Sequence, residues 1–137
     1  MSVFYRKVNY HETDKMGVTH HSNYIKYMEE SRIHFMDEMG YGYRKMEEDG
    51  VMSPVIGVEC QYKATTTFGD EIRIEVGVAE YRGAKLVMKY VMTNAVTGDL
   101  VLTGKTEHCF LTPEGKLIPL RRKLPEFDAL LKSLAEE

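Results

Sequence analysis

Two stretches of strictly alternating residues constrain the fold of this chain more than any other feature. The first contains Ile72, Ile74, Val76 and Val78, and the second contains Leu86, Met88, Tyr90 and Met92. A period of two is typical of a β-strand with one buried face. Only a short turn at Arg82 and Gly83 separates the two stretches, so we expect neighbouring antiparallel strands.

A long amphipathic helix is predicted upstream of these strands, from about Ser22 to Met39. Its apolar stripe recurs at spacings of three and four residues and comprises Tyr24, Met28, Ser31, Phe35 and Met39. Ser22 and Asn23 offer side chains that can cap the helix start, and Gly40 and Gly42 end it.

Further segments complete a single domain over residues 1–137. Strands are expected at residues 3–9, 51–62, 100–111 and, as a short piece, 117–119, and shorter helices at 44–49 and from Pro125 onward. The fold class is therefore α+β, with the long helix lying across one face of a curved antiparallel sheet. Because one helix covers only part of such a sheet, the uncovered face and the sheet edge predict a homodimer at least.

Composition excludes several classes of protein. The formal net charge of -3 argues against a dedicated nucleic-acid binder. No apolar run is long enough to cross a bilayer, and the N-terminus lacks the pattern of a signal peptide, so a cytoplasmic protein without membrane contacts is expected. Cys60 and Cys109 are then expected to be reduced.

The most reactive segment is the stretch from Tyr10 to Tyr24. It could be a capped loop, a metal site or an acyl-transfer site. The candidate metal ligands are His11, Glu12, Asp14, His20 and His21. Their spacing matches no zinc signature, so no metal is expected. His34 and His108 stand alone and are expected to be satisfied by neighbouring groups.

The same segment resembles a known family. The matching residues are Asp14, Gly17, Val18, His21, Asn23, Tyr24, Glu29 and Arg32. They resemble the hotdog-fold acyl-CoA thioesterases of the 4-hydroxybenzoyl-CoA thioesterase type, and the order of elements agrees over nearly the whole chain. The resemblance implies dimers joined edge to edge, often paired into tetramers, with active sites between subunits. It implies an acyl-CoA or acyl carrier protein thioester as substrate and no cofactor beyond the coenzyme A of that substrate.

The resemblance also implies roles for individual residues. Asp14 is the expected catalytic carboxylate, acting as nucleophile or as general base on water. The backbone N–H of His21 is the expected oxyanion donor at the start of the long helix, and Gly17 lets the loop approach the substrate. Tyr24 and Glu29 are expected near the substrate, although packing of Tyr24 and an ion pair between Glu29 and Arg32 are open alternatives.

Basic residues are expected where the phosphates of coenzyme A rest. The candidates are Arg82, Lys85 and Arg121, the last beginning a run of three cations. Two other functions stay open at this point: a hotdog acyl-thioester hydratase or dehydratase, and a non-catalytic acyl-CoA-binding module. The identity and length of the acyl group are beyond the sequence.

Overall fold

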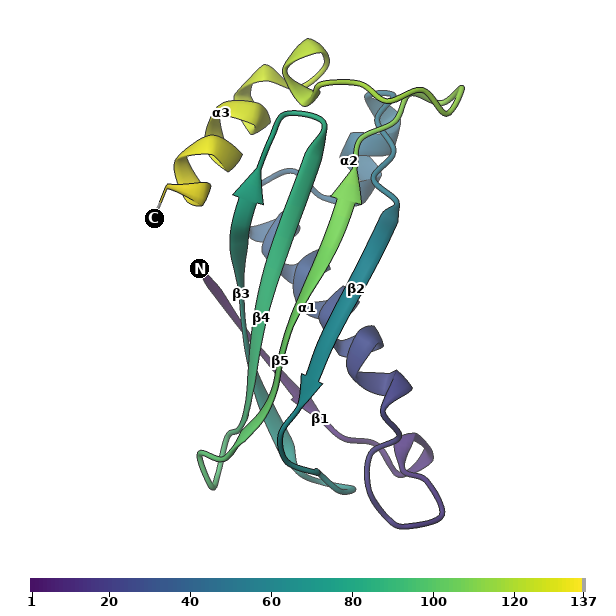
Figure 1. Ribbon diagram of the computed structural model, residues 1–137, viewed down its shortest axis with the longest axis vertical. Coiled ribbons are helices and arrows are strands. Elements are labelled where there is room, and N and C mark those ends of the chain that lie inside the picture. Colours follow the sequence, from purple (N-terminus) through teal and green to yellow (C-terminus); the bar gives the residue numbers. More distant parts are fainter. Residues whose placement is uncertain (137) are drawn as a thin grey trace.

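The computed structural model describes residues 1–136 and contains one five-stranded antiparallel sheet (Figure 1). The strands are β1 (Ser2–Lys7), β2 (Val55–Tyr62), β3 (Glu71–Tyr81), β4 (Lys85–Asn94) and β5 (Leu100–Cys109). The helices are α1 (Ser22–Glu38), α2 (Tyr43–Glu48) and α3 (Pro125–Ala135), with 3-10 turns η1 (Tyr10–Glu12) and η2 (Leu120–Arg122). The strand order is β1-β3-β4-β5-β2, so β1 and β2 are the two edges.

The predicted alternation is confirmed on β3 and β4. The residues of both alternating stretches are buried on the face that α1 crosses, and Ile74 stands opposite Met92 in the register. The intervening residues face the other side of the sheet. This agrees with the arrangement that the resemblance implies, in which a curved sheet wraps a long helix (Figure 1).

Helix α1 buries the predicted stripe. Tyr24, Met28, Ser31 and Phe35 are each at most 4% exposed. Gly104 on β5 makes room for this packing, because a Cβ there would lie 2.4 Å from the terminal methyl of Met28. A glycine in the middle of a strand thus lets the helix lie close to the sheet.

The prediction of how α1 starts was wrong. The N-cap residue is His21, and no side chain caps the helix. Ser22 instead bonds to the His20 ring (2.8 Å), and the amide of Asn23 donates to the backbone oxygen of Glu12 (2.9 Å). These polar side chains bind the preceding loop to the helix rather than the free N–H groups of the first turn.

Strand ends also differ from the sequence predictions. Strand β2 starts at Val55, after Pro54, and has an irregularity between Val55 and Gly57. The short strand expected at residues 117–119 is only an isolated bridge between Leu117 and Leu111. Proline has no N–H for the ladder, which explains why β2 begins after it. No helix within residues 1–136 is long and apolar enough to span a membrane.

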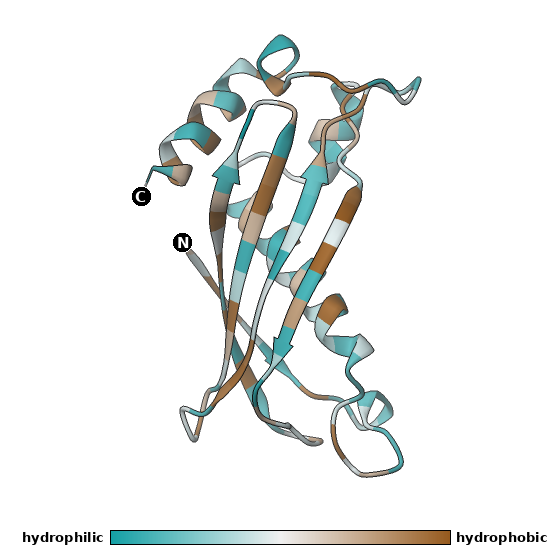
Figure 2. Cartoon of the chain, in the orientation of Figure 1, coloured by the Kyte–Doolittle hydropathy of each residue, from teal (hydrophilic) through white to brown (hydrophobic). Residues whose placement is uncertain are grey.

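The edge of the sheet that β2 forms exposes apolar side chains. Strand β2 presents half-exposed apolar side chains, namely Val55, Ile56, Val58 and Tyr62. Figure 2 shows hydrophobic bands along this strand. A terminal strand with unpaired backbone groups and apolar side chains is a ready surface for another strand.

Candidate active site

The loop between η1 and α1 forms a compact hairpin-like turn. The N–H of Asp14 donates to the oxygen of Val18 (2.8 Å), and the N–H of Gly17 donates back to the oxygen of Asp14 (3.0 Å). Gly17 has φ +82°, a conformation that residues with a side chain rarely adopt. A Cβ at Gly17 would meet nothing within 4 Å, so the backbone conformation explains this glycine better than close contact does.

Threonines attach this loop to the segment that follows β2. The N–H of Thr19 donates to the oxygen of Thr66 (2.8 Å), and the hydroxyl of Thr66 lies 2.7 Å from that of Thr19 and 2.8 Å from that of Tyr24. The hydroxyl of Thr67 donates to the oxygen of Gly17 (2.6 Å). The loop, the start of α1 and the end of β2 are thereby fixed together.

A cleft of about 350 Å³ lies where these three segments meet. Its lining residues are Asp14, Met16, Val18, Thr19, His21, Tyr24, Tyr62, Lys63, Ala64 and Thr65. The Asp14 side chain is half-buried, and its Oδ1 accepts the N–H of Met16 (2.9 Å). Within residues 1–136, Oδ2 accepts no hydrogen bond and Asp14 forms no ion pair, so a carboxylate oxygen is free to act in the cleft.

The start of α1 leaves one backbone donor free. The N–H of Ser22 donates to the His20 ring (3.2 Å), that of Asn23 to the oxygen of His20 (3.0 Å) and that of Tyr24 to the oxygen of His21 (3.3 Å). The described part of the chain offers no acceptor to the N–H of His21 itself. This N–H lies at the positive end of the helix and can donate to a carbonyl oxygen that becomes negative.

Aromatic side chains form one wall of the cleft. The ring of Tyr62 lies 6.2 Å from that of His21, edge to face, and 5.9 Å from that of Tyr24. The exposed imidazole of His21 also stacks on His20 at 4.4 Å. Tyr24 is both a packing residue, 4% exposed, and part of the lining. Tyr62 and residues 63–65 could not be predicted as lining residues, because their approach to the loop depends on tertiary structure.

Glu12, two residues before Asp14, has a different environment. It is 4% exposed and accepts hydrogen bonds from the N–H of Asn9 (2.8 Å), the hydroxyl of Tyr27 (2.9 Å) and two nitrogens of Arg6 (2.8 and 3.1 Å). Burial alone would raise the pKa of Glu12, but these donors outweigh it and hold the pKa below its ordinary value. Glu12 therefore holds the loop in place.

Comparison with known proteins identifies the family. The thioesterase-like superfamily matches residues 8–133 of this chain. The protein named "Putative acyl-CoA thioesterase YneP" of Bacillus subtilis is 32% identical over 122 residues, which cover 88% of each chain. A DHNA-CoA thioesterase from Staphylococcus aureus has a structure similar to this one, with a TM-score of 0.91 and 31% identity over 98% of this chain and 90% of that one.

The chain belongs to the thioesterase-like superfamily. The resemblance inferred from the segment around Asp14 is thus confirmed, and so is the hotdog fold. Relatives named as thioesterases and thioester hydrolases place the chain among the enzymes that hydrolyse thioesters.

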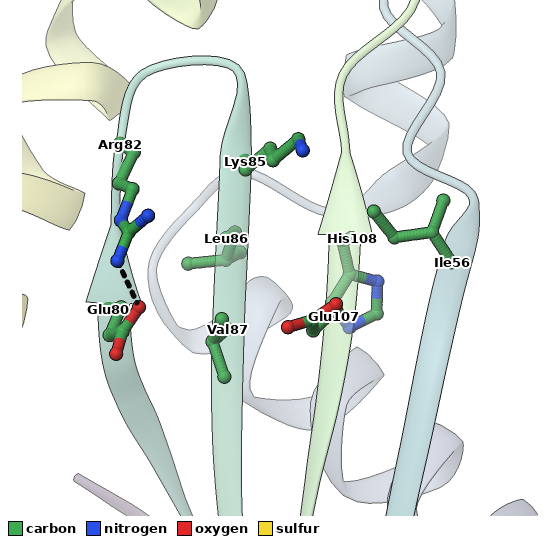
Figure 3. Close-up of a pocket in the computed structure, with 8 residues that line it drawn as sticks. All are labelled: Ile56, Glu80, Arg82, Lys85, Leu86, Val87, Glu107 and His108. Atoms are coloured by element: carbon green, nitrogen blue, oxygen red, sulfur yellow. Dashed lines mark hydrogen bonds and ion pairs between the residues drawn. The ribbon is translucent and has the colours of Figure 1, made fainter.

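In this thioesterase-family chain the three predicted phosphate-binding residues lie together but far from Asp14. All three are exposed. Arg82 and Lys85 flank the β3–β4 turn, and Arg121 belongs to η2, where the N–H of Leu120 donates to the oxygen of Gly83 in that turn (2.9 Å). This end of the sheet lies opposite the loop between η1 and α1 (Figure 1). Arg82 and Lys85 line a cavity of about 140 Å³, where Arg82 pairs with Glu80 at 3.2 Å (Figure 3). None of the three lines the cleft of Asp14 in the same chain.

The remaining predicted residues lie further along α1. Glu29 is exposed and does not line the cleft. It makes no ion pair with Arg32, which is buried and donates instead to the hydroxyls of Tyr43 (2.6 Å) and Tyr90 (3.0 Å). His34 pairs with Glu38 at 2.7 Å. Nowhere in residues 1–136 do three potential metal ligands gather.

One expectation about histidine was only half right. His108 is 1% exposed, and its Nε2 bonds to the hydroxyl of Thr106 (2.8 Å), but its Nδ1 has no partner. Burial, together with the nearby charge of Arg32, lowers the pKa of His108 to about 4, so the ring is neutral at neutral pH.

Proposed function

We propose that this protein is an acyl-CoA thioesterase that hydrolyses a thioester to the free acid and coenzyme A. One observation carries the proposal. The free Oδ2 of Asp14 and the free N–H of His21 belong to residues that line the same cleft. These are the two groups that acyl transfer requires, an activating carboxylate and an oxyanion donor.

Two routes use the same residues. As nucleophile, Asp14 attacks the thioester carbon, the coenzyme A thiolate leaves, and water then hydrolyses the mixed anhydride. As general base, Asp14 takes a proton from water while that water attacks the same carbon, and the proton passes to the leaving thiolate. In both routes negative charge forms on the carbonyl oxygen, where the N–H of His21 stabilises it.

We also propose that the working unit is a homodimer joined through β2 or a tetramer of such dimers. The half-exposed apolar residues of β2 and its unpaired backbone edge support this assembly. Because Arg82, Lys85 and Arg121 lie far from the cleft of their own chain, they can hold coenzyme A phosphates only at a cleft of a neighbouring copy. Glu29 also lies outside the cleft of its own chain, so it stays a predicted substrate contact at the cleft of a neighbouring copy.

The test is thiol release by the purified protein from a panel of acyl-CoA thioesters that includes short, long, aromatic and α,β-unsaturated acyl groups. We expect hydrolysis of at least one member. Loss of the double bond of an enoyl-CoA without thiol release would indicate a hydratase instead. Tight binding without turnover would indicate a non-catalytic module, and either result would overturn the proposal. Acyl carrier protein thioesters in the same assay establish the preferred carrier.

A further inference from the structure

A second polar cluster, around Arg32 of α1, lies between this helix and the sheet. It has more hydrogen-bond donors than acceptors. Arg32 is 5% exposed, and within residues 1–136 no carboxylate lies within ion-pair distance of it. Its Nε and Nη1 donate to the hydroxyls of Tyr43 and Tyr90, which are neutral groups. A buried cation without an anionic partner is costly unless a ligand or solvent compensates it.

Hydrogen bonds continue from Arg32 through two hydroxyls to a histidine. Arginine can only donate, so the oxygen of Tyr90 accepts from it. The hydroxyls of Tyr90 and Thr106 lie 2.7 Å apart, and that of Thr106 lies 2.8 Å from Nε2 of His108. At the end of this row, Nδ1 of His108 is buried without a partner.

Two further residues, Tyr43 and Ser53, line a neighbouring cleft, and their hydroxyl hydrogens have no acceptor within residues 1–136. The hydroxyl of Tyr43 accepts from Arg32, and its own hydrogen finds no acceptor in the described part of the chain. Ser53 has a buried hydroxyl oxygen without a partner. Both residues line a cleft of about 520 Å³ with Glu47, Gly50, Val51, Met52, Pro54 and Pro113. This lining is mainly apolar, as in pockets that take small ligands, and Glu47 is an exposed carboxylate among the lining residues.

This cleft and the catalytic cleft lie at opposite ends of β2. Pro54, immediately before β2, lines the donor-rich cleft, and Tyr62, the last residue of β2, lines the catalytic one. Seven residue steps separate Val55 from Tyr62, which is about 23 Å of extended strand. A short acyl group held at Asp14 cannot span this distance within one chain.

In a dimer joined through β2, the donor-rich cleft of one copy can lie near the catalytic cleft of the other. If β2 pairs antiparallel with β2 of a partner, the strand direction reverses, so the Pro54 end of one copy lies beside the Tyr62 end of the other. Val58 and Tyr62 are half-exposed apolar side chains on this edge strand, between the two clefts.

We propose that Tyr43 and Ser53 of the second copy form the distal end of the acyl pocket and select an acyl group whose far end carries a hydrogen-bond-accepting oxygen, as a carboxylate or a hydroxyl. This inference rests on the proposed thioesterase function. Tyr43 and Ser53 line the cleft, and the hydroxyl hydrogen of each finds no acceptor in the described residues, so a plain alkyl end would leave both unpaired. Sites built to hydrogen-bond a substrate oxygen discriminate strongly against analogues that lack it.

The experiment compares three thioesters of equal length: octanoyl-CoA, 8-hydroxyoctanoyl-CoA and the mono-CoA thioester of octanedioic acid. We expect kcat/KM for at least one oxygenated thioester to exceed that for octanoyl-CoA about tenfold or more, and the better of the two distinguishes a hydroxyl from a carboxylate. Ser53→Ala and Tyr43→Phe should each reduce this ratio about fivefold or more. Tyr41→Phe, which removes a hydroxyl bonded to Glu126 outside the cleft, should leave the ratio unchanged.

The origin of Ser53 is tested in mixed dimers, purified with two different tags, of one Asp14→Asn chain and one Ser53→Ala chain. If Ser53 acts across the interface, the one site with an intact Asp14 has an intact Ser53 from its partner, and the wild-type ratio returns. A ratio that stays at the Ser53→Ala value would overturn the contribution of the second copy. Equal rates for all three thioesters in the wild type, or no hydrolysis of these three by an enzyme that hydrolyses other members of the acyl-CoA panel, would overturn the selectivity alone. Absence of hydrolysis across the whole panel would overturn the thioesterase function as well.

Discussion

Glu12 and Asp14 stand two residues apart in one loop, yet the structure gives them opposite environments. Glu12 is buried and accepts four hydrogen bonds, two of them from Arg6. Asp14 is half-buried, accepts one, and lines a cleft. A carboxylate surrounded by donors stabilises structure, and one with a free oxygen, in a cleft that a residue with a free N–H also lines, can do chemistry. The first carboxylate holds the loop so that the second is positioned at the start of α1.

The largest effect on stability is expected from removal of the cation that holds Glu12. Arg6→Met leaves a buried carboxylate without its ion-pair partner, so we expect the free energy of unfolding to fall by about 3 kcal/mol. Urea denaturation followed by circular dichroism measures this. As a control, Arg44→Met removes an exposed pair with Glu48 and should change stability by less than about 0.5 kcal/mol. Equal effects of the two variants would contradict the structural role of Glu12.

Acid should affect Glu12 in a defined direction. Its folded pKa lies below the ordinary value of 4.5, so its stabilising contribution is complete above that value and is lost as the pH falls through the folded pKa. Unfolding free energies measured from pH 6 to pH 3 should therefore decrease less steeply in Glu12→Gln than in the wild type. Identical slopes would show that the donors around Glu12 do not bind its ionised form preferentially.

The smallest effect is expected from the His21 side chain. His21→Ala keeps the backbone N–H, and loss of a whole oxyanion donor costs about 10²-fold to 10³-fold in kcat, so we expect a loss below about tenfold. Steady-state thiol release gives this value. A loss as large as that of Asp14→Asn would mean that the imidazole takes part in the reaction. Asp14 would then differ less in function from its neighbours in the loop.

The sequence predicted well where local pattern decides structure. The alternation of Ile72 and Ile74 shows which face of β3 is buried, because strand periodicity is a local property. The motif around Asp14 likewise predicted the family, which the comparisons confirm; its assignment of roles to Asp14 and His21 stays a prediction. Single-residue chemistry was less predictable. Ser22 was predicted to cap the helix, but its hydroxyl bonds to the His20 ring instead. A serine hydroxyl can both donate and accept, so the sequence does not show which neighbour it binds.

Long-range contacts were beyond the sequence. Tyr62 lines the cleft of Asp14, and the contact between Thr66 and Thr19 joins the segment after β2 to the loop. The partners of Glu12 likewise come from β1 and α1. An ion pair of Arg32 with Glu29 was an open alternative, and only the folded structure shows that Arg32 is buried and bonded to tyrosine hydroxyls instead. Each of these facts depends on which segments meet in the folded chain.

The most direct test of the central claim is thiol release per folded molecule by Asp14→Asn and Glu12→Gln, with the folded fraction of each preparation measured by urea denaturation. We expect Asp14→Asn to lose about 10³-fold in kcat while keeping its stability, because Asn can still accept the N–H of Met16. Glu12→Gln should lose about 2–4 kcal/mol of stability and keep its kcat within about threefold. A folded Asp14→Asn that remains fully active, or a folded Glu12→Gln that is inactive, would contradict the division of roles between the two carboxylates.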